Sequence, residues 1–62
     1  MTPPVGQVWE SYDGDEAYLV LGHEDGWVTI LFLDSGPDRP YPLDGRVVNA
    51  SKGYVTAGRR LA

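Results

Sequence analysis

The feature that most constrains the fold is an uninterrupted apolar stretch in the middle of the chain, residues 27–34. Turn-forming sequences, Glu24–Gly26 and Ser35–Pro37, bound it on both sides. Eight residues rich in β-branched and aromatic side chains have the length and composition of a strand, not of a helix. One face of this strand would carry Val28, Ile30 and Phe32, and the other Trp27, Thr29, Leu31 and Leu33. Because both faces are largely apolar, we expect both to be covered by a sheet that curls on itself.

Four further short strands are predicted by similar patterns, at residues 7–12, 17–23, 46–49 and 54–56. Asp-Gly pairs, which favour tight hairpin turns, stand before the strands at 17–23, 27–34 and 46–49. The pair at Asp25-Gly26 predicts a hairpin of the second and third strands. Five short strands with polar turns in so short a chain predict an all-β fold, a five-stranded small barrel.

The barrel domain is expected at residues 6–62, preceded by a flexible N-terminal arm at 1–5 whose prolines cannot donate to a sheet. Residues 35–45, with three prolines, are predicted to form a loop. The predicted core consists of Val8, Leu19, Leu21, Val28, Ile30, Phe32, Val47 and Val55.

The composition limits what can support this fold. A chain of 62 residues forms one domain at most, and without cysteine it has no disulfide and no thiolate metal site. No segment approaches the roughly 20 apolar residues of a membrane span, and the first residues lack the basic and apolar regions of a signal peptide. We therefore expect a soluble, cytoplasmic protein without membrane contact.

The C-terminal sequence Gly53-Tyr54-Val55-Thr56-Ala57 resembles the end of an SH3 domain, and Gly26-Trp27 is similar to the start of an SH3 strand. The resemblance implies an SH3-like small barrel. The Pro and Tyr that help to form the peptide groove of SH3 domains are replaced by Thr56 and Arg59, so recognition of Pro-rich peptides is not implied. The opening residues 5–9 resemble small barrel proteins of actinobacteria and their phages, which would place a phage-encoded chain in the host cytoplasm.

Catalytic and metal chemistry find little support in the sequence. The single histidine, His23, has no serine in a nucleophile motif to serve, and we interpret it as a solvated turn residue. Acidic residues from Asp13 to Glu24 have the length of a calcium loop, but Tyr18 stands where the loop needs glycine. We expect no enzymatic activity, no cofactor and no metal.

Aromatic residues are the strongest indication of function, because a small barrel can bury only a few of them. The candidate protein-binding residues are Trp9, Tyr12, Trp27, Tyr41 and Tyr54. Three of them, Trp9, Trp27 and Tyr41, could form one outward cluster. The alternative is that the Pro-rich loop folds over them to make a second small core.

The charges are distributed unevenly around a formal net charge of −4. All nine acidic residues lie between Glu10 and Asp44. The charged residues of the segment 45–62 are all basic: Arg46, Lys52, Arg59 and Arg60. These bases could pair with the acids of the body, or form a patch that binds nucleic acid. The main hypothesis is a protein-interaction module that binds a host protein, another partner or a second copy of itself; the alternative is a nucleic-acid-binding barrel.

Overall fold

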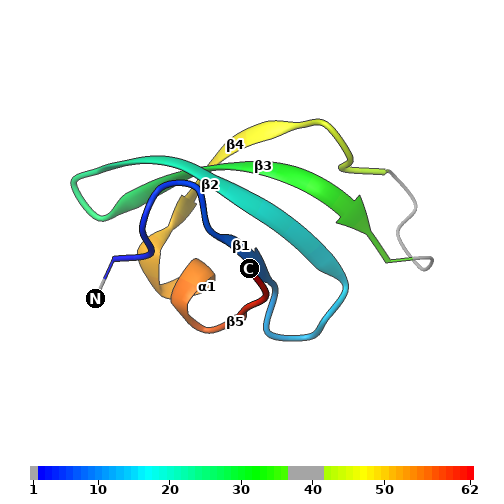
Figure 1. Ribbon diagram of the computed structural model, residues 1–62. Coiled ribbons are helices and arrows are strands. Elements are labelled where there is room, and N and C mark those ends of the chain that lie inside the picture. Colours follow the sequence, from blue (N-terminus) through cyan, green and yellow to red (C-terminus); the bar gives the residue numbers. More distant parts are fainter. Residues whose placement is uncertain (1, 37–41) are drawn as a thin grey trace.

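The computed structural model describes residues 2–36 and 42–62 and is mostly β (Figure 1). Five antiparallel strands form one sheet in the order β4-β3-β2-β1-β5, accompanied by one short helix, α1. The elements are β1 (Val8–Glu10), β2 (Glu16–Glu24), β3 (Trp27–Ser35), β4 (Val47–Ser51), α1 (Lys52–Thr56) and β5 (Arg59–Arg60). The all-β prediction is confirmed, and four of the five predicted strands are present within two residues at each end.

The hairpin of β2 and β3, the two longest strands, forms the central part of the sheet. Its turn consists of Asp25 and Gly26, which have φ values of 47° and 82°. Two consecutive residues with positive φ are typical of the tight turn whose twist matches that of a hairpin, so the predicted hairpin is confirmed. Register shifts after Ala17 and after Val20 mark two bulges, which increase the twist of the long strands.

The predicted strand at residues 54–56 is wrong, because these residues belong to α1. Tyr, Val and Thr favour strands, but Ser51 caps a helix: its side-chain oxygen accepts a hydrogen bond from the backbone N–H of Tyr54 at 3.2 Å. The fifth strand lies further along, at Arg59–Arg60, and pairs with β1. The segment that resembles the end of an SH3 domain is therefore helical in its centre.

The sheet does not close into a barrel. The strands at its two edges, β4 and β5, lie at opposite ends of the strand order, and each pairs with a single neighbour. Because β5 has only two residues, few of its backbone groups are available to pair with β4. The expectation that both faces of the sheet are covered is consequently wrong as well.

The core lies on one face of the sheet, which we call the inner face. Its buried side chains are Tyr18, Val20, Val28, Ile30, Phe32 and Val55, and α1 contributes the last of these. Figure 1 shows α1 and β5 on one side of the long hairpin. The predicted inner residues of β3 are confirmed, and so is Val55.

The opposite, outer face carries four residues that were predicted to lie in the core. Leu21 and Val47 are 42% and 58% exposed, and Val8 and Leu19 are only half-buried. In β2 the faces are the reverse of the prediction, because Tyr18 and Val20 point inward. Both faces of β2 are apolar, so alternation could not identify the inner one.

The start of the chain, predicted as a flexible arm, lies against the sheet from Thr2 onward. Pro3 is buried, and its carbonyl oxygen contacts Nε2 of His23 on β2. The backbone N–H of Gly6 donates to the carbonyl of Val20 at 2.9 Å. These contacts continue the sheet beyond the N-terminal end of β1.

Candidate protein-binding site

Two of the predicted binding residues, Trp9 and Tyr54, pack against the core. The indole N–H of Trp9 donates to Oε1 of Gln7 at 3.1 Å. The ring of Tyr54 lies 6.2 Å from that of Tyr18, and its hydroxyl donates to Oε2 of Glu16 at 3.3 Å. Both aromatic side chains are therefore partly buried within the fold, although Trp9 also lines a surface cavity of about 340 Å³.

The two candidates that are exposed, Tyr12 and Trp27, lie at opposite ends of β2. Tyr12 is in the turn before β2 and is 72% exposed, whereas Trp27 follows the turn after β2 and is 54% exposed. The nine residues of β2 separate them by roughly 26 Å. Tyr41 lies outside the described residues. The structure thus does not bring Trp9 and Trp27 together: Trp9 joins the main core, and Trp27 lies on the outer face.

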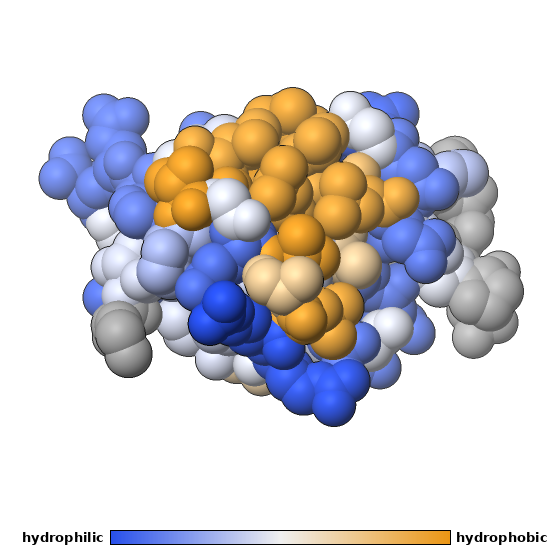
Figure 2. Space-filling view, in the orientation of Figure 1, coloured by the Kyte–Doolittle hydropathy of each residue, from blue (hydrophilic) through white to orange (hydrophobic). Residues whose placement is uncertain are grey.

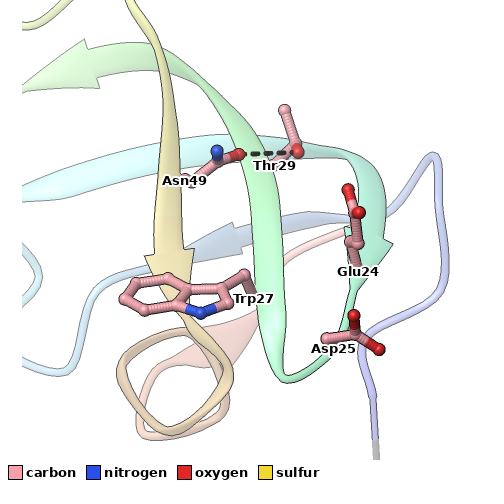
Figure 3. Close-up of a pocket in the computed structure, with 5 residues that line it drawn as sticks. All are labelled: Glu24, Asp25, Trp27, Thr29 and Asn49. Atoms are coloured by element: carbon pink, nitrogen blue, oxygen red, sulfur yellow. Dashed lines mark hydrogen bonds between the residues drawn. The ribbon is translucent and has the colours of Figure 1, made fainter.

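Trp27 forms one wall of a surface cavity of about 320 Å³ (Figure 3). The cavity is lined by Glu24, Asp25, Trp27, Thr29 and Asn49. The tight turn at Asp25-Gly26 places the two acidic residues beside the start of β3, and Trp27 pairs with Glu24 across the hairpin. The side of the cavity toward β4 is held by a cross-strand hydrogen bond, in which Oγ1 of Thr29 donates to Oδ1 of Asn49 at 2.9 Å.

The lining of this cavity combines an aromatic ring with two carboxylates. Glu24 and Asp25 are both exposed, and Figure 3 shows them on one side of the start of β3, whereas the indole of Trp27 extends on the other side, toward β4. Lys52 does not line this cavity, but borders a neighbouring cavity of about 190 Å³ that shares Glu24, Asp25 and Trp27 with the first. The face of an aromatic ring attracts cations, and so does a carboxylate, so a cation in this cavity would be attracted by both.

The basic residues do not form one patch. Arg46 and Lys52 stand at opposite ends of β4, whereas Arg59 and Arg60 form β5 at the other edge of the sheet. Arg59 is paired: its guanidinium lies 2.7 Å from Oε1 of Glu10 on β1. The prediction that C-terminal bases pair with acids of the body is confirmed at this position.

The described part of the chain contains neither a cluster of metal ligands nor a membrane-spanning helix. His23 lies at the end of β2, and no three His, Cys, Asp or Glu side chains within residues 2–36 and 42–62 gather closely enough to hold a metal ion. The same residues include no helix that is long and apolar enough to cross a membrane.

Sequence reasoning missed a buried polar group beneath α1. Glu16 lies outside the strand predicted at residues 17–23, yet it begins β2 with an exposed fraction of 2% and accepts the Tyr54 hydrogen bond. Beside it, the hydroxyl of Tyr18 donates to the carbonyl of Val55 at 3.3 Å. Burial raises the pKa of Tyr18 to about 12, and the neighbouring Tyr54 contributes to the increase. The sequence signal was the alternation itself, which continues from Val20 through Tyr18 to Glu16.

Comparisons with protein-family models, with curated proteins and with solved structures find no match to this chain.

Proposed function

We propose that the chain is a non-enzymatic protein-interaction module that holds a segment of a partner protein in the Trp27 cavity. An SH3-like arrangement of the strands is part of this proposal. It is supported by the strand order and by the short helix between β4 and β5, with the sheet left open between these two strands.

The observation that carries the proposal is the half-exposed indole of Trp27 beside a cavity. Tryptophan is costly to leave in water and is the residue most enriched at the centres of protein interfaces. Of the two tryptophans, only Trp27 lies more than half exposed; Trp9 is packed on the core. The site is held on rigid elements, because β3 pairs with both β2 and β4.

The chemistry of the lining favours a cationic side chain. Glu24 and Asp25 would attract the charge of an arginine or lysine, and the indole face of Trp27 would contact it. Each term is small at an exposed site, about 0.5–1 kcal/mol, so the apolar neighbours of the cation must contribute the remaining affinity. We therefore expect a short basic segment that also carries apolar residues.

Selection from a random peptide library against the full chain tests the proposal. We expect the selected peptides to share an arginine or lysine, and we expect Trp27→Ala to weaken their binding by at least about 10-fold. Tyr12→Ala is the matched control, because it removes an exposed aromatic side chain at the other end of β2. Selected peptides without a basic residue, or equal binding by Trp27→Ala, would refute the proposed site.

The nucleic-acid alternative is tested in the same series. Binding of single-stranded DNA or RNA at low salt that is lost in Arg46→Ala or Arg60→Ala, but retained in Trp27→Ala, would favour that function over the one proposed.

A further inference from the structure

The outer face of the sheet carries a continuous row of apolar side chains from one edge to the other. Register places Val8 opposite Leu19, Leu19 opposite Leu31, and Leu31 opposite Val47. The backbone N–H of Leu61 donates to the carbonyl of Val8 at 2.7 Å, so Leu61 continues the row beside β1. With Leu21 and Leu33, which project from the bulges on the same face, these residues form what we call the outer patch: Val8, Leu19, Leu21, Leu31, Leu33, Val47 and Leu61.

Figure 2 shows a broad hydrophobic area on this side of the molecule, over the long hairpin. Leu21, Leu33 and Val47 are each about half exposed, with fractions of 42%, 45% and 58%. The hydrogen-bonded pair of Thr29 and Asn49 separates the outer patch from the Trp27 cavity. The outer patch is thus a second surface, with its own chemistry.

We propose that the outer patch is covered by a second copy of this chain, giving a dimer in which the two sheets stack face to face. This inference does not depend on the proposed function, because it concerns different residues. Monomeric proteins seldom expose an apolar area that spans a whole sheet, whereas two such faces pack well as a sandwich.

The size of the face supports a second copy as the occupant. The row crosses the sheet at about 4.8 Å per strand, a span of roughly 19 Å, and outward positions repeat about every 6.8 Å along each strand. Complete burial of the patch side chains on both copies would remove on the order of 1,000 Å² from water in total, which just reaches the smallest area expected of a specific interface. An identical face offers the same outline and the same apolar character, as a two-fold interface requires.

Stability supports the same occupant. The buried core of the described residues consists of six apolar side chains, and the chain has no cysteine to form a disulfide. Small domains of this kind often gain stability by association. Two chains of net charge −4 repel each other. Because the middle of the outer patch carries no charge, this repulsion comes from more distant groups, and salt screens it.

Sedimentation velocity of the full chain over a range of concentrations, at low and at high salt, tests the dimer. We expect a concentration-dependent dimer that becomes tighter as salt increases, whereas contact between opposite charges would become weaker. The double variant Leu21→Ser with Val47→Ser should raise the dissociation constant by at least about 10-fold, because each substitution occurs twice in the interface. Tyr12→Ser, which removes an even more exposed side chain from the turn between β1 and β2, should leave the dissociation constant unchanged.

A wild-type chain that stays monomeric at every concentration and salt would overturn the proposal. This holds even if the patch turns out to bind a different protein. A dimer that the double variant does not weaken would overturn it too, since the contact would then lie elsewhere. Circular dichroism verifies that the variants are folded, and Val47→Ser alone serves if the double variant is not. The double variant Glu24→Gln with Asp25→Asn, at the turn of the hairpin, should weaken peptide binding without weakening the dimer, so the two proposals can fail separately.

Discussion

The substitution Gly58→Ala tests the C-terminal half of the fold most severely. Gly58 lies between α1 and β5, where the chain crosses β1. A methyl group on its Cα would stand 1.9 Å from the carbonyl oxygen of Glu10 and 3.2 Å from the hydroxyl of Tyr18. The first of these atoms belongs to the backbone of a paired strand, so the contact cannot be relieved by a side-chain rotation.

The size of the effect follows from this contact. Relief requires β1 and β5 to move apart by more than an ångström, and overpacking of this kind costs about 1–3 kcal/mol or more. A domain of 62 residues has a total stability of about 3–9 kcal/mol, so a large part of it would be lost. Gly53→Ala is the matched control: it lies in α1, nothing lies within 4 Å of the added atom, and alanine should stabilise the helix by up to about 1 kcal/mol.

Urea unfolding followed by tryptophan fluorescence measures both variants. We expect the midpoint to fall sharply for Gly58→Ala and to stay or rise for Gly53→Ala, with a difference in the free energy of unfolding of about 1–4 kcal/mol between two identical substitutions. Equal stability of the two variants would refute the placement of β5 against β1.

Three further results are expected. Between pH 10 and 12 the free energy of unfolding should fall by about 1 kcal/mol per pH unit, because the raised pKa of Tyr18 keeps it protonated in the folded state while the unfolded chain loses the proton; Tyr18→Phe should flatten this decline, and an unchanged slope would argue against the buried hydroxyl. Ser51→Ala should cost about 1 kcal/mol in thermal unfolding and Ser51→Asp should restore most of it, whereas equal losses would exclude a capping role. Acrylamide should quench the fluorescence of Trp9→Phe, which retains the exposed Trp27, more strongly than that of Trp27→Phe; the opposite order would place the wrong tryptophan at the surface.

The hairpin and the strand positions could be predicted because local signals determine them. Asp25-Gly26 is a strong turn signal, and the apolar stretch that follows leaves little choice of register. Only one inner face was predicted correctly, that of β3. In β2 both faces are apolar, and the inward direction is set by Tyr18, whose hydroxyl needs the partner that α1 provides.

The helix and the candidate site depended on information that the sequence states less clearly. Residues 54–56 have strand propensity, and the capping residue that overrides it, Ser51, lies between the strands predicted at 46–49 and 54–56. The five aromatic candidates could not be separated by alternation alone, because whether a residue such as Trp9 is covered depends on packing between distant segments. The Trp27 cavity follows only in part from local sequence: Glu24, Asp25 and Trp27 lie around one turn, whereas Asn49 reaches the cavity through the pairing of β4 with β3.

The most direct test of the proposed binding role is an NMR titration that follows the indole N–H signals of the two tryptophans. The titrants are a short arginine peptide and the same peptide with neutral citrulline in place of arginine. The account predicts that the arginine peptide shifts the Trp27 signal and the amides of Glu24 and Asp25, while citrulline has little effect and Trp9, bonded to Gln7, does not respond. Equal shifts with both peptides, or a response at Trp9 instead of Trp27, would contradict it.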